Sequence, residues 1–382
     1  MHDQVIIGMD PHKASNTIAV LTRSEELLTR HRFDNSDDGF IDMLAAVEEY
    51  PSRLWAVEGA NGIGRSIAQR LVSFGETVVD VPAKLSTRVR VYSTGHGTKT
   101  DNTDALAVGR AAIHSRHLRH VQPDDATVAL KLLSDRRHEL VGLRTQAACR
   151  LHRLLRELIP GGAATNLKAE KAFALISDIQ PDDPAGQMRL EIALDHIEDI
   201  MRLDRKLDDC NKRIIAEIKA TGTTLTRVYG IGPINAAVIL GEVGDATRFA
   251  TRDNFASYTG AAPVSASSGD HQRHRLNRAG NRRLNHALHI AAITQIRQDT
   301  PGRIYYRRKV AEGKSHKEAL RALKRRISDA VWRQLQTDRS EDRTQDEQWP
   351  RWPSSRGNLV AYHSPDTLRA NGKPKNPKFV VV

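Results

Sequence analysis

The run VIIGMD, residues 5–10, decides how the first part of the chain folds, because a short apolar run ends there directly on a carboxylate. Its apolar part, Val5–Met9, has the length of a buried strand. Leu54–Val57 (LWAV) and the β-branched run Thr77–Val81 (TVVDV) have the same character. Residues 40–50 and 63–74 carry apolar side chains at helical spacing. Strands that alternate with helices predict an α/β layer domain.

Carboxylates follow two of these predicted strands, Asp10 after VIIGM and Glu58 after LWAV. Side chains at the carboxyl ends of strands in an α/β unit converge at one edge of the sheet. Two further acids, Asp101 and Asp104, lie one helical turn apart in KTDNTDALAVGR, residues 99–110. Taken alone, this last pair is also typical of a helix start, where acids contribute about 0.3–1 kcal/mol through the helix dipole.

The combination of these acids predicts a metal site. Carboxylates brought together repel one another unless a cation neutralises them, and oxygen-rich carboxylate sites suit Mg²⁺ or Mn²⁺. Two such ions can activate a nucleophile and stabilise the leaving oxygen in phosphodiester cleavage. The histidines lack the spacing of zinc ligands, so we predict no zinc site.

The positive charge of the chain is concentrated in one region. The 382 residues carry a net charge of +12, and residues 271–333 contain 17 Lys and Arg against 4 Asp and Glu. So localised an excess is typical of a protein that binds a polyanion, most often nucleic acid, although a solubilising surface is the alternative. We expect no membrane-spanning helix and no secretory signal, and two buried cysteine thiols in a reducing cytosol.

Two long amphipathic stretches occupy the middle of the chain. Residues 125–158 and 188–218 each carry a stripe of Leu, Ile, Met and Ala, and Pro160-Gly161-Gly162 ends the first stretch. The stripes include Leu143 in the first stretch and Leu194 and Met201 in the second. Together they predict an antiparallel coiled coil, or alternatively a helical domain that packs on its neighbours. A dimerising role for the pair stays open.

A third unit extends from Thr221 to about Leu335. It begins with Gly230-Ile231-Gly232-Pro233, a helix–hairpin–helix-like turn that can offer backbone N–H groups to a phosphate. Tyr305 and Tyr306 lie among cations and could stack on bases, but they also suit a core. The charged and proline-rich tail that follows Leu335 is expected to be poorly ordered.

A serine-rich stretch lies inside this unit. Ser265, Ser267 and Ser268 precede Gly269 and indicate an exposed turn. Arginine binds phosphate bidentately, and a serine beside several arginines is what phosphoryl transfer to a hydroxyl requires. The alternative is a serine-rich loop leading into a nucleic-acid-binding helix. The candidate phosphate-binding residues are Arg273, Arg275, Arg278, Arg282 and Arg283.

With these features read in order, the chain resembles the DEDD-type insertion-sequence transposases, also described as bridge-RNA-guided recombinases. The matching pieces span roughly residues 5 to 335. In chain order they are GMDPHK, AVEGANG, KTDNTDA, YGIGPINAA and APVSASSG followed by HRLNRAGNRRLNHAL.

The resemblance implies an RNase-H-like, RuvC-like domain over residues 1–120, whose metal-binding tetrad is Asp10, Glu58, Asp101 and Asp104. It further implies a coiled coil over 121–220 and a mainly α-helical transposase domain over 221–335, followed by the tail at 336–382. The family's nucleophilic serine precedes a glycine and follows a proline by five residues, which selects Ser268, with Ser267 as the fallback.

The implied partners are donor and target DNA, a structured non-coding guide RNA and further copies of the chain, as a dimer or tetramer, in the bacterial cytosol or nucleoid. The expected activity is DNA transposition with Mg²⁺ or Mn²⁺ through a phosphoserine intermediate. Two rival hypotheses remain: a junction-resolving nuclease that uses metal-bound water and leaves Ser268 dispensable, and a non-catalytic nucleic-acid-binding protein.

Overall fold

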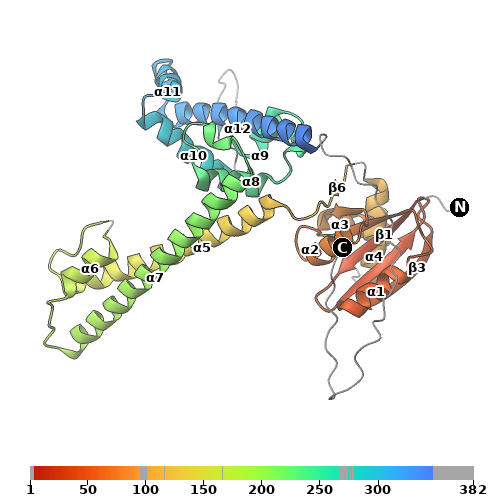
Figure 1. The fold of residues 1–382 in the computed structure, drawn as a ribbon, viewed down its shortest axis with the longest axis horizontal. Helices are drawn as coiled ribbons and strands as arrows, with labels where there is room; N and C mark the ends of the chain where they lie inside the picture. The colour runs from red at the N-terminus through yellow and green to blue at the C-terminus, as the bar shows by residue number, and fades with distance from the viewer. Residues whose placement is uncertain are drawn as a thin grey trace, which may run out of the picture.

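The structure, a computed structural model, describes residues 4–94, 101–115, 117–165, 167–265, 274–275, 277 and 279–346. Figure 1 shows an α/β domain, a long pair of helices and a helical domain that lies at one end of that pair. The segment between the α/β domain and the helical pair contains the short strand β6 (Arg119–His120). Most of the expected tail lies outside the described residues.

A six-stranded sheet forms the centre of the α/β domain, in the order β3-β2-β1-β4-β5-β6. Strands β1, β4 and β5 are mutually parallel neighbours, whereas β2, β3 and β6 run antiparallel to the strands beside them. The predicted strands are confirmed, and β2 and β3 are additional. The bounds are β1 Val5–Pro11, β2 Ser15–Leu21, β3 Leu27–Asp34, β4 Arg53–Glu58 and β5 Val78–Val81.

Helices cover both faces of this sheet. On one face, α1 (Asp37–Ala45) and α2 (Arg65–Ser73) pack against Ile7, Met9 and Val57. On the other face, α3 (Ala83–Thr94) and α4 (Asp101–His114) cover the alternate residues of the same strands, including Ile6 and Ala56. Because side chains alternate along a strand, each position of β1 and β4 is thereby assigned to one face.

Helix α4 lies very close to β1. A Cβ atom on Gly8 would overlap the carbonyl oxygen of Ala105 and the backbone nitrogen of Gly109, and one on Gly109 would overlap the side chain of Leu21. Glycine at both positions therefore allows the helix and the strand to approach each other, which brings the first turn of α4 next to the end of β1.

We expect Gly8→Ala to reduce the free energy of unfolding by about 1–3 kcal/mol, because the added methyl group must push α4 away from the sheet. Gly142→Ala is the matched control. Gly142 lies in a helix with nothing within 4 Å of its Cβ position, and this change should stabilise the protein by about 0.5–1 kcal/mol. Urea unfolding measures both, and a Gly8→Ala variant as stable as the wild type would contradict the close packing.

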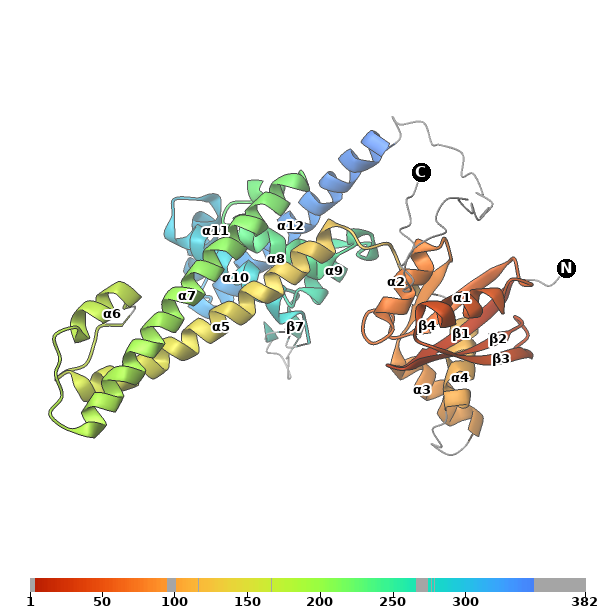
Figure 2. The same cartoon turned by 60° about the horizontal axis from the view of Figure 1, so that its bottom comes forward.

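The long helices α5 (Ala126–Leu158) and α7 (Pro184–Ala220) lie side by side in Figures 1 and 2, with α6 (Ala169–Ile176) packed near their far end. Both helices were predicted to within a few residues, but their buried stripes differ from the prediction. Leu143, Leu194 and Met201 are exposed, whereas Ala193 and Ile200 are buried. The apolar surface of each helix is broader than one stripe, so spacing alone did not identify the contact line.

The helical domain shares one core with the near end of the helical pair. Leu133 of α5 and Ile214 of α7 belong to the same buried cluster as Phe255, Leu288 and Val331. The expected boundary at residues 220 and 221 therefore falls inside a continuous core. The helices of this domain are α8 (Pro233–Val243), α9 (Arg252–Tyr258), α10 (Arg282–Arg297), α11 (Pro301–Ala311) and α12 (His316–Asp346). Helix α12 extends beyond residue 336, where the tail was expected to begin.

The two cysteines differ in environment. Cys210 is buried and its thiol lies 3.5 Å from the carbonyl oxygen of Leu133, whereas Cys149 is exposed. The expectation of two buried thiols is therefore wrong for Cys149, which lies on the outward side of α5. Within the described residues, no helix combines the length and the apolar character needed to cross a bilayer.

Candidate active site

Two of the four predicted acids, Asp10 and Glu58, project from the same face of the sheet. In β1, Asp10 follows Ile6 and Gly8 at alternate positions, and these two residues face α4. In β4, Glu58 follows Ala56, which also faces α4. Asp10 and Glu58 each come directly after the paired residues Met9 and Val57 of the two parallel strands. The strand-end carboxylates are thus neighbours on the α4 side of the sheet.

Helix α4 adds the third acid from above this face. Asp104 precedes Val108 and Ala111 at helical spacing, and both of these residues pack on the sheet. Asp104 is 4% exposed and Asp10 is 6% exposed, so both carboxylates lie in the layer between α4 and the sheet. Asp101 is the first residue of α4, but its side chain lies outside the described residues.

Neighbouring side chains hold these acids. The hydroxyl of Ser86, in α3, donates a hydrogen bond to Oε1 of Glu58, and Ser86 is 3% exposed. Nδ1 of His12 lies 3.6 Å from Oδ2 of Asp10. Among the side chains that the structure describes, no three His, Cys, Asp or Glu groups lie at the spacing of a metal site. Asp10 and Glu58 share one face and one edge of the sheet, and Asp104 lies in the helix that packs on this face.

The residues that flank the serine stretch pair with each other in the helical domain, and we call these two strands the serine hairpin. Strands β7 (Val264–Ser265) and β8 (His274–Arg275) pair antiparallel, with Val264 opposite Arg275. The candidate nucleophiles Ser267 and Ser268, and the candidate phosphate contacts Arg273 and Arg278, lie outside the described residues. The hairpin starts from the end of α9 and returns to the start of α10.

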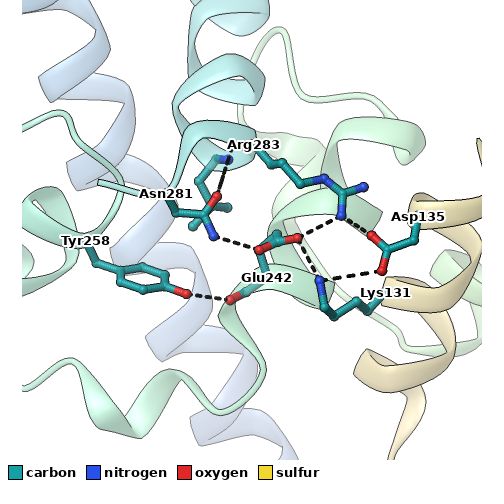
Figure 3. A network of polar contacts seen from close by, with 7 residues as sticks. Lys131, Asp135, Glu242, Tyr258, Asn281 and Arg283 are labelled. Atoms are coloured by element: carbon teal, nitrogen blue, oxygen red, sulfur yellow. Dashed lines mark hydrogen bonds and ion pairs between the residues drawn. The ribbon is translucent and has the colours of Figure 1, made fainter. Parts of the chain in front are cut away.

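The backbone of Arg275 lies in β8, but its side chain lies outside the described residues. The other two arginine candidates differ from each other. Arg282, the first residue of α10, is exposed, which suits a phosphate contact. Arg283 contacts Asp135 of α5 and Glu242 of α8 through its guanidinium, at 2.9 Å in the second case. These two carboxylates occupy Arg283, so its observed role is to connect α10 to α5 and α8 (Figure 3).

Glu242 is the centre of this network, as Figure 3 shows. Its carboxylate accepts hydrogen bonds from Lys131 Nζ at 2.9 Å and from Asn281 Nδ2 at 2.6 Å. Asn281 also caps α10 through its Oδ1, so one side chain both starts the helix and binds Glu242. The network joins the helical pair to the domain that carries the serine hairpin. Sequence reasoning missed Glu242, although a lone acid in the apolar helix PINAAVILGEV was a visible signal.

The surroundings of Glu242 lower its pKa. Burial opposes ionisation, but hydrogen bonds from Lys131 and Asn281 and the charges of Lys131 and Arg283 outweigh it. Because the pKa of the folded state lies below that of the unfolded state, this ionisation stabilises the fold above the ordinary glutamate pKa of about 4.3. The stabilisation is lost as the pH falls through the lowered pKa.

We expect Glu242→Gln to reduce the free energy of unfolding at pH 7 by about 1–3 kcal/mol, because Lys131 and Arg283 lose a shared counter-charge in a partly buried site. The difference from the wild type should shrink as the pH falls below 4. Urea titrations of both proteins at several pH values measure it, and Glu139→Gln, at an exposed acid of α5, is the control. A difference in unfolding free energy that stays constant with pH would contradict the lowered pKa assigned to Glu242.

Comparison with known proteins identifies similar transposases. Residues 7–160 match a family model described as "Transposase", and residues 222–307 match one described as "Transposase IS116/IS110/IS902 family". The 44.8 kDa protein of insertion element IS116 from Streptomyces clavuligerus is 26% identical, over 88% of this chain and 96% of that protein. The 42 kDa protein of IS900 from Mycobacterium paratuberculosis is 25% identical over the same shares. A probable family 20 transposase of Pseudomonas aeruginosa is 27% identical, over 70% of this chain and 76% of that protein.

The acid-edged α/β domain, the basic helical domain and these matches place the chain among the transposases. Specifically, it belongs to the IS116/IS110/IS902 family of insertion-sequence transposases.

Proposed function

We propose that this transposase excises and inserts an insertion sequence by metal-assisted DNA cleavage and strand exchange through a phosphoserine intermediate. The observation that carries the proposal is that Asp10 and Glu58 end neighbouring strands on one face of the sheet, and that α4, which packs on this face, contributes Asp104. The strand order, with antiparallel β2 beside β1 and parallel β4 and β5 on its other side, supports the RNase-H-like assignment.

The donor set at this edge suits a hard divalent cation. Asp10, Glu58 and Asp104 offer only carboxylate oxygens, which Mg²⁺ and Mn²⁺ prefer. Asp101, one helical turn before Asp104, completes the proposed tetrad. When bound, the metal supplies charge neutralisation at the scissile phosphate. Ser86, through its hydrogen bond to Glu58, fixes one ligand in place.

Ser268 is the proposed nucleophile, with Ser267 as the fallback. Its Oγ loses its proton and forms a bond to phosphorus, while the bond from phosphorus to the DNA 3′ oxygen breaks and that oxygen is protonated. A 3′ hydroxyl of a second strand then attacks phosphorus and releases the serine. Because the ester conserves the phosphodiester bond, rejoining needs no nucleotide hydrolysis. Arg273, Arg275, Arg278 and Arg282 are the proposed phosphate contacts.

We further propose that a structured non-coding RNA pairs with donor and target DNA, that the helical pair is a coiled coil, and that two or more copies assemble in the bacterial cytosol. Exposed cations in α11, in the segment after it and at the start of α12 support a polyanion partner, since Arg307, Lys314 and Lys317 all face solvent. The acids and the serine hairpin lie in different domains (Figure 2), which supports a site assembled from two copies.

The proposal is tested by incubating the protein with the element-end DNA, the RNA transcribed beside the gene and Mg²⁺, then separating the products on a denaturing gel. We expect a covalent protein–DNA adduct that maps by mass spectrometry to Ser268. Cleaved DNA without an adduct would favour the junction-resolving nuclease, and DNA that is bound but never cut would favour the non-catalytic binding protein.

A further inference from the structure

A buried lysine lies beneath the serine hairpin. Lys324 of α12 is 7% exposed, and its Nζ donates a hydrogen bond to Oδ1 of Asn285 at 2.6 Å. Burial lowers the pKa of Lys324 to about 8. Among the described residues no carboxylate forms an ion pair with it, whereas its neighbour Arg325 pairs with Asp253 and Asp329. A buried cation whose partner is a neutral amide reduces the stability of the fold, which suggests that Lys324 has a functional role.

Asn285 connects Lys324 to the backbone of Thr259, close to where the serine hairpin begins. Its Nδ2 donates to the carbonyl oxygen of Thr259 at 3.0 Å. A side-chain amide has one accepting and one donating end. The cation can contact only the accepting end, so Lys324 turns the donating end of Asn285 toward Thr259. Helix α12 makes a second contact here, because the hydroxyls of Ser328 and Thr259 lie 3.2 Å apart.

Thr259 lies where both limbs of the hairpin meet. The next residue, Gly260, has a φ of +68°, and a Cβ atom on Gly280 of the returning limb would overlap its backbone. The backbone N–H of Asn281 donates a hydrogen bond to the carbonyl oxygen of Tyr258 at 2.7 Å. Nδ2 of Asn277 donates one to the carbonyl oxygen of Ser257 at 3.2 Å. The chain before β7 and the chain after β8 thus contact each other at the end of α9, next to the Lys324–Asn285 contact.

We propose that Lys324 is a positioning residue for the serine hairpin and acts through the amide of Asn285. The inference rests on the proposed role of Ser268 as nucleophile. Ser268 lies between β7 and β8 in the chain, so a shift of these strands is expected to misplace it, and a misplacement of about 1 Å costs on the order of 10²-fold in a reaction that depends on alignment.

Two variants separate the two halves of this connection. Lys324→Met replaces the buried cation with an apolar chain of similar length, and Asn285→Asp keeps an acceptor for Lys324 but removes the donor to Thr259. We expect both variants to fold and to bind DNA as the wild type does, and to form the serine–DNA adduct about 10–100-fold more slowly. Lys219→Met, at an exposed lysine of α7, is the control and should react at the wild-type rate.

Hydrogen exchange gives a readout that does not depend on catalysis. Peptides covering residues 256–265 and 277–285 should exchange faster in Lys324→Met than in the wild type, with little change in the α/β domain. In the wild type, protection of these peptides should weaken between pH 7 and 9, as Lys324 loses its charge, after correction for intrinsic exchange. His289 of α10 interacts with the charge of Lys324, and burial followed by the charges of Lys324 and His286 lowers the pKa of His289. The lowered pKa keeps the His289 imidazole neutral over this range, so His289 does not account for the change.

The outcomes distinguish the inference from the function on which it rests. A Lys324→Met protein with wild-type adduct formation and wild-type exchange would overturn the positioning role and leave Ser268 untouched. Failure of the wild type to form an adduct would overturn the proposed function, and the exchange experiment would still decide whether Lys324 holds the hairpin.

Discussion

Ser268→Ala is expected to abolish the covalent protein–DNA adduct and to slow strand cleavage by on the order of 10³-fold or more, as removal of a nucleophile does in other enzymes with covalent intermediates. In the proposed mechanism the hydroxyl forms the ester bond that conserves the phosphodiester, and water in its place would give hydrolysis instead of exchange. The measurement is the rate of adduct formation on a denaturing gel.

The adjacent serine provides the control for this prediction. Ser267→Ala changes the same loop in the same way and should retain adduct formation to within a few-fold if Ser268 is the nucleophile. The opposite pattern would move the role to Ser267 and keep the mechanism. Full cleavage in the double variant, without an adduct, would leave the nuclease as the surviving hypothesis.

Asp10→Asn is expected to have the second largest effect. Asparagine keeps the shape of the side chain and removes its charge, so the proposed metal site loses a carboxylate that is 6% exposed at the end of β1. Since metal ions contribute several kcal/mol at a reacting phosphate, we expect cleavage to fall by on the order of 10³-fold. Glu58→Gln and Asp104→Asn should behave alike.

Metal binding by calorimetry separates this effect from misfolding. The affinity for Mn²⁺ should fall in Asp10→Asn and stay unchanged in Asp38→Asn, at an exposed acid of α1 on the opposite face of the sheet. Equal Mn²⁺ binding in the wild type and in Asp10→Asn would remove Asp10 from the ligand set.

Much of the α/β domain was predictable from its local pattern. The central strands β1, β4 and β5 are nearly continuous apolar runs, because both of their faces are covered. Strand β3, LLTRHRFD, was missed because it is an edge strand with mostly half-exposed or exposed residues and several charges. Strand β2, SNTIAVL, is wholly buried, but it was not predicted because its first three residues are polar.

The candidate site was predictable to the extent that it depends on strand ends. Asp10 and Glu58 could be named because parallel neighbours end at one edge, and Asp104 because it lies with Asp101 in the first turn of a predicted helix. Ser86, Glu242 and Lys324 could not, since their roles depend on tertiary partners: Glu58, Arg283 and Asn285 respectively. For the same reason Arg283 looked like its neighbour Arg282 in the sequence, yet it contacts two carboxylates in the structure.

The most direct test of a joint site is to mix two inactive proteins, Asp10→Asn and Ser268→Ala, under conditions where subunits exchange. If the acids of one copy act on the serine hairpin of another, each mixed pair keeps one intact site, and random mixing in a dimer should restore about a quarter of the wild-type adduct. A mixture that stays as inactive as its two components, although subunit exchange is demonstrated, would contradict a site shared between copies. Adduct in either protein alone would show that acids and serine do not work together at all.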